Sequence, residues 1–193
     1  QTYMPFVRNV YLVVSRPSQI PAWADENKLH IVLHKDIIPK EYLPTFNSTT
    51  IEMFLHRIPG LDEQYIYFND DIFPVSDCTP GDFFENGAPV VYHTRCLLAL
   101  NLYKKMTRNT DRKARKIAGA GKSLFFVRPQ HTVSSMLRSV GDEVFGAMEP
   151  EILSSLSRCR EEKNLLQYLF SDYLFYCGKT VRRKISNRHF SLA

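Results

Sequence analysis

This 193-residue sequence lacks long apolar runs, paired cysteine motifs and an initiator methionine. No stretch approaches the roughly 18 consecutive apolar residues of a transmembrane helix, so we expect none. The first ten residues have neither the basic start nor the small-residue cleavage site of a signal peptide. Because the chain opens with Gln1 and enters a strand-like run almost at once, we expect it to be the central part of a longer protein.

Cysteine is scarce, and its placement is uninformative for metal binding. The four cysteines, Cys78, Cys96, Cys159 and Cys177, form no CxxC pair and have no zinc-ligand spacing. A chain of this length needs no disulfide to stabilise its core, so we expect free thiols. With 44% apolar and 23% charged residues, the composition excludes a fully disordered chain.

Charge is unevenly divided along the chain. The formal net charge is +5, but residues 1–95 contain seven Lys or Arg against twelve Asp or Glu, for a net of −5. Residues 96–193 contain eighteen against eight, for a net of +10. The two parts are therefore expected to have different electrostatic roles.

The apolar pattern predicts an α/β protein. Short runs of β-branched and aromatic residues predict strands at 9–15, 29–33 and 64–68, and Asn47 or Ser48 can cap a helix between the last two. We expect residues 1–95 to form a sheet layer and residues 96–193 to form a mainly helical part of the same domain. The helices expected in that second part cover residues 97–117, 132–140, 142–156 and 161–177.

The turn Asn69-Asp70-Asp71 follows the third predicted strand. Ligands of α/β sheets bind beyond the carboxyl ends of strands, and two adjacent carboxylates suit a hard divalent cation. A solvated turn with an Asx cap is the alternative, because Asp pairs are common in turns.

Three basic or titratable side chains stand just before predicted helices. His131 could act as a general acid or base or contact a phosphate, although a lone histidine is more often structural. Arg158 and Arg160 could grip a phosphate, although solvated arginines are the usual case.

Eight basic residues between Lys104 and Lys122 are accompanied by one acid, Asp111. Nucleic-acid binding is not expected, because aromatic residues for base stacking do not interleave this run. A solvated helix face, an anionic membrane or a charged acceptor fits equally well. The segment Gly119–Ser123 imitates a phosphate-binding loop, but it lacks the loop's first glycine and the strand before it.

The first half resembles the second conserved region of the Stealth family. These sugar-1-phosphate transferases include bacterial capsular polysaccharide phosphotransferases and the GlcNAc-1-phosphotransferase of animals. The resemblance runs in order through Met4–Val13, Gln19–Trp23, Val32–Asp36, Leu43–Ser48, Ile51-Glu52, Leu55–Leu61 and Tyr65–Asp71. The later half is similar to the third conserved region, with the family's histidine at His131 and its arginine at Arg160.

The match departs from the family pattern at two positions. The family commonly has Asp where Asn164 stands and Pro where Val133 stands. The first and fourth conserved regions are expected before Gln1 and after Ala193, respectively.

The resemblance implies a nucleotide-sugar-transferase-like sheet layer, of Rossmann or GT-A type, followed by the helical half. It also implies a reaction that moves an intact hexose- or N-acetylhexosamine-1-phosphate from a nucleotide-sugar donor to a glycan acceptor. Attack at the β-phosphorus forms a phosphodiester and releases nucleoside monophosphate. A divalent cation, Mg²⁺ or Mn²⁺, neutralises the pyrophosphate.

We assign roles on this basis. Asp70 and Asp71 hold the metal or orient the acceptor hydroxyl, and one of them could act as the base. His131 and Arg160 complete the catalytic set as acid/base or phosphate contact and as phosphate neutraliser. The substrate-binding residues are expected to be Arg8, Asn47, Ser48, Glu52, Asn69 and Arg158.

Two other functions remain open from the sequence. One is a non-catalytic module that binds a glycan or polyanion, and the other is a metal-dependent glycosyltransferase. The resemblance favours a bacterial, cytoplasmic enzyme of capsule synthesis at the inner face of the membrane, with peripheral membrane contact through its basic segments. The oligomeric state is left open.

Overall fold

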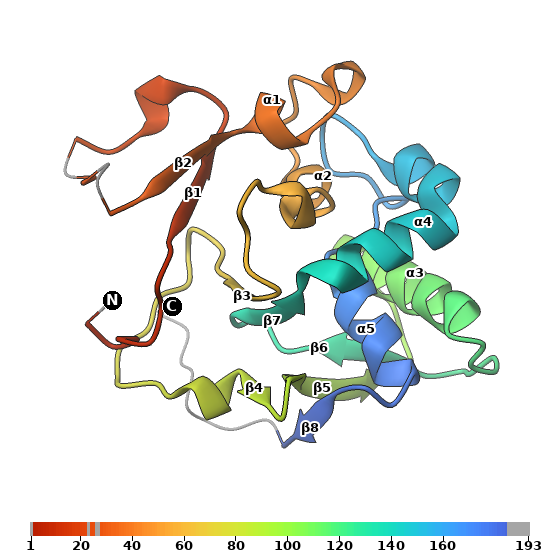
Figure 1. The fold of residues 1–193 in the computed structure, drawn as a ribbon. Coiled ribbons are helices and arrows are strands. Elements are labelled where there is room, and N and C mark those ends of the chain that lie inside the picture. Colours follow the sequence, from red (N-terminus) through yellow and green to blue (C-terminus); the bar gives the residue numbers. More distant parts are fainter. Residues whose placement is uncertain (1, 23, 26–27, 185–193) are drawn as a thin grey trace.

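The computed structural model of the chain describes residues 2–22, 24, 25 and 28–184, and it is a mixed α/β structure (Figure 1). Trp23 of the family resemblance lies outside the described residues. Three separate sheets are packed around helices, rather than one continuous sheet layer. The α/β class is confirmed in this general sense.

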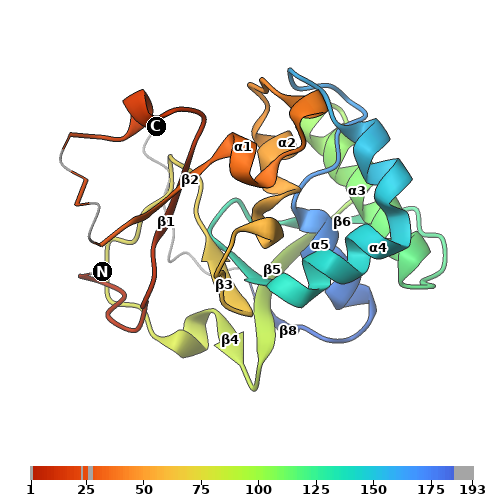
Figure 2. The ribbon, with the colours of Figure 1, turned by 45° about the horizontal axis from the view of Figure 1, so that its top comes forward.

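The first sheet is a parallel pair. Strand β1 (Tyr11–Val14) pairs with β2 (His30–Leu33) in a register that runs from Tyr11 opposite His30 to Val14 opposite Leu33. Both strands are short and rich in β-branched residues, as predicted, and Val14 and Val32 are buried. Figure 2 shows this pair at one side of the molecule, next to helix α1 (His34–Ile37).

The second sheet joins the two halves of the chain. Strand β3 (Gln64–Tyr67) pairs antiparallel with β7 (Ser134–Leu137), and it does not extend the β1–β2 sheet. The prediction of a helix over 132–140 is therefore wrong for most of that segment. Pairing with β3 provides backbone partners that local helix propensity cannot anticipate, because they come from about 70 residues earlier.

The third sheet contains the longest strand, β5 (Ala88–Cys96). It pairs antiparallel with β4 (Phe84–Glu85) and β6 (Phe126–Pro129), and parallel with β8 (Val181–Arg183). The second half of the chain thus contributes strands as well as helices to the structure.

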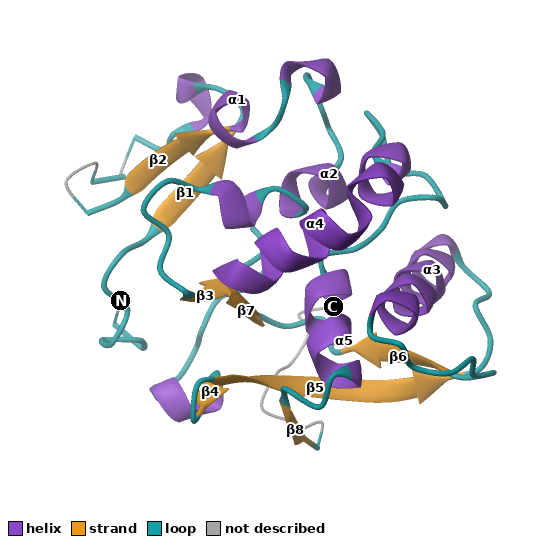
Figure 3. Ribbon diagram, turned by 45° about the vertical axis from the view of Figure 1, so that its right-hand side comes forward, coloured by secondary structure: helices purple, strands orange, loops and turns teal. Residues whose placement is uncertain are grey.

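Three longer helices pack on these sheets. They are α3 (Leu102–Ile117), α4 (Arg138–Ser155) and α5 (Tyr168–Tyr176). Figure 3 shows α5 between α4 and the β5–β6 sheet. Helix α4 is broken at Met148, two residues before Pro150, where the backbone leaves helical angles. Helix α5 is shorter than the predicted 161–177.

Short helical turns complete the chain. Helix α2 (Ser48–Glu52) is capped by the Asn47 side chain, which accepts a hydrogen bond from Thr49 N, in agreement with the sequence-based expectation. The 3₁₀ turns are Pro17–Gln19, Lys40–Tyr42, Leu55–Arg57 and Pro80–Asp82.

One hydrophobic core draws on both halves. It includes Val32 and Phe54 from the first half and Val144, Ile152 and Leu169 from the second. All four cysteines are free, as expected. Within the described residues, no helix combines the length and the apolar composition needed to cross a membrane.

Candidate functional site

The β3–β7 register brings Asn69 and His131 together. Tyr67 of β3 lies opposite Ser134 of β7, so the residues just after β3 meet those just before β7. Asn69 Nδ2 lies 3.3 Å from His131 Nε2. Asn69 is therefore at the carboxyl end of a strand, as predicted, but that strand is antiparallel to its neighbour.

Tyr67 connects this pair to Glu52. Its hydroxyl lies 2.5 Å from Asn69 Oδ1 and 3.1 Å from Glu52 Oε1, so one hydroxyl hydrogen serves two acceptors. With Oδ1 of Asn69 accepting, its Nδ2 can only donate. His131 Nε2 then acts as the acceptor in this contact. The result is a chain of polar contacts from Glu52 to His131.

Glu52 is a buried carboxyl at the end of α2. Burial raises the pKa of Glu52, and the Tyr67 hydrogen bond, the charge of Arg160, a main-chain hydrogen bond from Gln167 and the Ser48 hydroxyl oppose that rise. A carboxyl with a raised pKa inside a polar cluster is a frequent feature of functional sites.

Arg160 approaches the same cluster from another segment. Its Nη2 donates to Ser48 Oγ over 2.9 Å, and its charge acts on the pKa of Glu52. Ser48 is the first residue of α2 and Glu52 is the last, so both lie on one helical turn. A guanidinium at this position is available to an anion while it remains anchored.

Two buried asparagines hold the turn that carries Arg160. Asn47 Nδ2 donates to Ser157 O and Cys159 O, and to Asn164 Oδ1 over 3.0 Å. Asn164 in turn donates to Ser155 O over 2.6 Å and accepts from Glu161 N. The turn is therefore fixed by side chains from both halves of the chain.

Asn47 lies in the interior, whereas the sequence predicts that it contacts substrate. Its side chain is 1% exposed, and its amide and carbonyl are both used in these internal hydrogen bonds and in the α2 cap. It positions Ser48 and Arg160 rather than facing a ligand.

Asp70 and Asp71 lie on the surface beside the cluster. Burial, the Glu52 contact and then the charges of Asp70 and Asp71 raise the pKa of Tyr67, which places both carboxylates within electrostatic range of its hydroxyl. No group of three or more metal-ligating side chains occurs among the described residues. Two exposed carboxylates nevertheless fit the way in which Mg²⁺ binds, because it takes its remaining ligands from water and substrate phosphates.

The two remaining predicted residues have other partners. Arg8 forms a surface ion pair with Asp62 over 3.0 Å, and Asp62 is not among the predicted site residues. The Arg158 guanidinium stacks over the Phe46 ring at 5.3 Å, next to the turn of Arg160. Of the ten predicted residues, Ser48, Glu52, Asn69, His131 and Arg160 form one connected group.

Three residues in and around the cluster, Tyr67, Ser134 and Gln167, are not among the predicted site residues. Tyr67 is central to the cluster, and its only signal was its place two residues before Asn69 in the Tyr65–Asp71 block. Gln167 gives Glu52 a main-chain partner, while its Nε2 donates to Ser134 Oγ over 3.0 Å. Nothing in the sequence marks Ser134 or Gln167, because they reach the site only through the β3–β7 pairing and the start of α5.

Comparison with known proteins finds similarity to one family. Residues 1–91 match Stealth protein CR2, conserved region 2. Capsular polysaccharide phosphotransferase cps1A of Actinobacillus pleuropneumoniae is 31% identical over 196 residues, covering 93% of this chain and 52% of that protein. Capsular polysaccharide phosphotransferase fcs1 of Haemophilus influenzae is 33% identical, covering 94% of this chain and 52% of that protein.

A third relative has a higher identity over a shorter stretch of the chain. The capsular polysaccharide phosphotransferase of Neisseria meningitidis serogroup B is 47% identical over 89 residues, covering 45% of this chain and 23% of that protein. The chain spans about half the length of the curated relatives that it matches over most of its own length. By this similarity the chain belongs to the Stealth family, and its first 91 residues are the second conserved region of that family.

Proposed function

We propose that the protein transfers a hexose- or N-acetylhexosamine-1-phosphate from a nucleotide-sugar to a glycan hydroxyl in capsular or cell-surface polysaccharide. The product is a phosphodiester, and the leaving group is a nucleoside monophosphate. The observation that carries the proposal is the connected cluster of Ser48, Glu52, Asn69, His131 and Arg160, found in a chain whose relatives are named capsular polysaccharide phosphotransferases.

His131 is the group that we assign to proton transfer. Its Nε2 lies 3.3 Å from Asn69 Nδ2, and the exposed ring is open to an incoming hydroxyl. The acceptor hydroxyl displaces the Asn69 amide from Nε2 and gives its proton to that nitrogen as its oxygen attacks the β-phosphorus, and the bond to the departing nucleoside monophosphate breaks. Asn69 and Tyr67 orient the ring for this step.

The negative charge of the donor phosphates is neutralised by two groups. Arg160, anchored on Ser48, faces the donor's phosphates from the second half of the chain. Asp70 and Asp71 would hold a divalent cation, Mg²⁺ or Mn²⁺, which supplies further charge neutralisation when bound. The acidic and basic parts of the chain thus meet at one phosphate site.

The parallel β1–β2 pair supports the finer fold proposal. We infer that it is a part of the nucleotide-sugar-transferase-like sheet, of Rossmann or GT-A type, because parallel pairs with an adjoining helix are typical of such sheets. Upstream sequence that supplies further parallel strands would complete it.

Product analysis tests the reaction. The assay uses the longest open reading frame that contains the chain, with a panel of nucleotide-sugars, a glycan acceptor and Mg²⁺ or Mn²⁺. Release of nucleoside monophosphate supports the proposal. Release of nucleoside diphosphate would instead indicate a glycosyltransferase, and no release would indicate a binding module.

Paired variants test the residues. We expect His131→Ala, Asp71→Asn and Arg160→Ala each to lower turnover at least about a hundredfold, as removal of acid–base or charge-stabilising groups commonly does. Arg16→Ala and Asp77→Asn, which change exposed residues outside the predicted site, are the matched controls, and both should retain near-normal rates. Near-normal turnover by His131→Ala or Asp71→Asn in a folded protein would remove these residues from the mechanism.

A further inference from the structure

Six large apolar side chains are exposed at the end of the third sheet. Leu97, Leu98 and Leu100 lie between β5 and α3, Leu102 is the first residue of α3, and Leu124 and Phe125 directly precede β6. Their exposed fractions range from 42% to 83%. We call this set the apolar tip.

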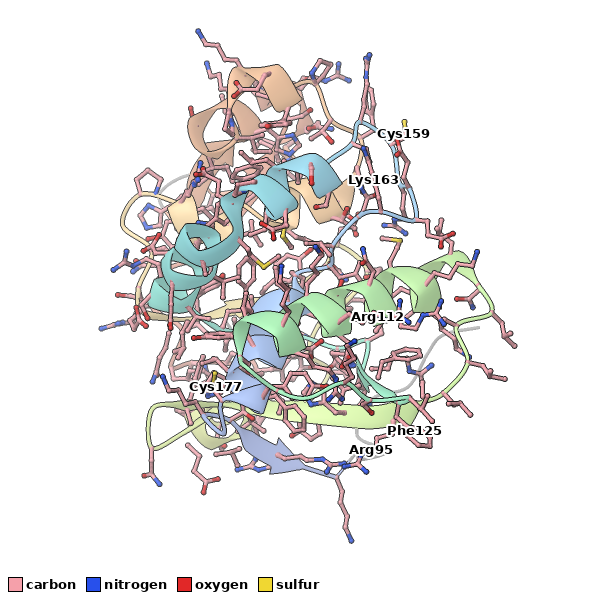
Figure 4. All side chains as sticks on the ribbon, turned by 90° about the vertical axis from the view of Figure 1, so that its right-hand side faces the viewer. Arg95, Arg112, Phe125, Cys159, Lys163 and Cys177 are labelled. Carbon is pink, nitrogen blue, oxygen red and sulfur yellow. The ribbon has the colours of Figure 1, made fainter. Side chains whose placement is uncertain are left out.

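The β5–β6 register makes these two segments neighbours. Cys96, the last residue of β5, lies opposite Phe126, the first residue of β6. Leu97 and Phe125 therefore follow directly outward from the same end of the pair. In Figure 4, Phe125 and Arg95 lie together at this end of β5. Clustered exposed apolar side chains of this kind are unusual on a free surface.

The surroundings of the apolar tip are strongly basic. Residues 95–128 contain ten Lys or Arg and one acid, Asp111. That acid is 1% exposed and pairs with Arg115 over 2.9 Å, so it adds no negative charge to the surface. Arg95 and Lys122, which flank the apolar tip in sequence, are both exposed. Arg112 lies on α3 in the same view (Figure 4).

We propose that the apolar tip docks on an anionic phospholipid membrane, with its Leu and Phe side chains inserted at the headgroup level and the flanking Lys and Arg on the lipid phosphates. Apolar insertion combined with basic residues is the requirement for peripheral binding to anionic lipid. A hydrated polyanion would use the basic residues and leave the leucines exposed. A second copy of the chain would bring two basic surfaces together, which is unfavourable. The proposal is independent of the proposed function.

Vesicle flotation tests this docking. The purified chain is mixed with vesicles of phosphatidylcholine alone, or of phosphatidylcholine with phosphatidylglycerol. We expect binding to the anionic vesicles to be at least about tenfold stronger, because each basic residue near such a surface contributes favourably. Absence of binding to the anionic vesicles would overturn the proposal.

Two double variants separate the two contributions. Arg95→Glu with Lys122→Glu should lose the preference for anionic vesicles. Leu98→Ser with Leu124→Ser should weaken binding to them at least about tenfold, since the apolar insertion is lost. Lys35→Glu and Phe73→Ser, which change exposed residues outside the apolar tip, should bind as the wild type does. Far-UV circular dichroism checks that each variant is folded.

The remaining outcomes identify other occupants. If the leucine variant binds anionic vesicles unchanged while the charge variant does not, the surface takes polyanions and the insertion is overturned. If the wild type is dimeric in sedimentation and the leucine variant is monomeric, the apolar tip is an interface between copies. A tryptophan introduced by Phe125→Trp should be quenched by brominated lipid, whereas one introduced by Phe73→Trp should not. Equal quenching would also contradict the proposal.

Discussion

At the scale of single residues, the site depends on a tyrosine that bridges two polar groups. Tyr67 contacts both Glu52 and Asn69, and Asn69 in turn contacts His131. The side chain of Asn69 ends in a carbonyl oxygen and an NH2 group. The hydrogen bond from the Tyr67 hydroxyl therefore decides which of the two faces the imidazole of His131. The contact between Asn69 and His131 is thus set by a residue that need not touch substrate.

The substitution Tyr67→Phe tests this control. It removes the hydroxyl while the ring is retained, so we expect kcat to fall about tenfold to a hundredfold with little change in KM. The free energy of unfolding should fall by only about 1 kcal/mol, the usual contribution of one hydrogen bond. Steady-state kinetics measured across pH provide the readout.

Tyr65→Phe is the control for this substitution, because Tyr65 lies in the same strand, two residues earlier. Its activity should stay near that of the wild type. An unchanged kcat and an unchanged pH profile in Tyr67→Phe would show that Asn69 orients His131 without the hydrogen bond from Tyr67.

A second residue-scale effect concerns stability. His56 is buried between Phe145 and Phe170, with ring centroids at 5.0 and 6.0 Å. Burial, chiefly, and the charge of Arg57 lower the pKa of His56 to about 4, while Asp142 opposes the shift. The unfolded chain therefore takes up a proton near pH 6.5, whereas the folded chain does so only near pH 4.

Stability should therefore fall as the pH falls from about 6.5 to about 4, by about 3 kcal/mol from His56 alone. Asp172 has the opposite effect. Burial raises the pKa of Asp172 to about 6, so its contribution to stability is lost as the pH rises through this range. The difference in denaturation free energy between the wild type and His56→Gln isolates the histidine. Parallel pH curves for the two proteins would contradict the buried neutral state of His56.

At the scale of elements, α4 is placed by a close approach to His56. A Cβ atom on residue 141 would clash with Cβ and Cγ of His56, well inside contact distance. Glycine at this position, Gly141, allows α4 to pack against the Leu55–Arg57 turn. Because α4 follows β7 directly, this contact also supports the strand that precedes it.

The pair Gly141→Ala and Gly146→Ala tests this packing in one helix. Gly141→Ala should lower the free energy of unfolding by about 1–3 kcal/mol through overpacking. At Gly146 an added Cβ would meet no atom within 4 Å, so Gly146→Ala should raise stability by up to about 1 kcal/mol through helix propensity. Chemical denaturation measures both, and equal effects of the two changes would show that the contact does not constrain α4.

At the scale of the whole molecule, the two differently charged halves form one structure. The core contains residues from Val32 to Leu174, β3 pairs with β7, and Asn47 bonds to Asn164. Each of these contacts crosses the boundary between residues 95 and 96. The acidic half carries Asp70 and Asp71, and the basic half supplies His131 and Arg160.

We therefore expect neither 1–95 nor 96–193 to fold when expressed alone. Each fragment would expose core surface that the other half covers, so it should show poor amide dispersion in NMR and no cooperative thermal transition. The intact chain should unfold in one transition. A cooperative transition in either isolated half would show that the halves are independent units.

Much of this organisation could be predicted because its signals are local. Strands β1, β2 and β3, the Asn47 cap and the α/β class follow from short apolar runs and capping chemistry. Five of the ten predicted site residues form the cluster, because the family resemblance and the charge pattern marked the segments that carry them. The sequence predicts helix where β7 forms, because a four-residue segment such as Ser134–Leu137 fits either structure until its partner is known.

The sequence by itself determined the α/β class, the family and the segments that carry the polar groups, because residue types, spacing and caps act over a few positions. Only the tertiary structure decided that Tyr67 bridges Glu52 and Asn69, that Asn47 is an internal support, and that Leu97 and Phe125 share one exposed end. Those outcomes depend on pairing between segments far apart in the chain. Strand register and helix packing settle such pairings through the burial of a common core, which no local pattern encodes.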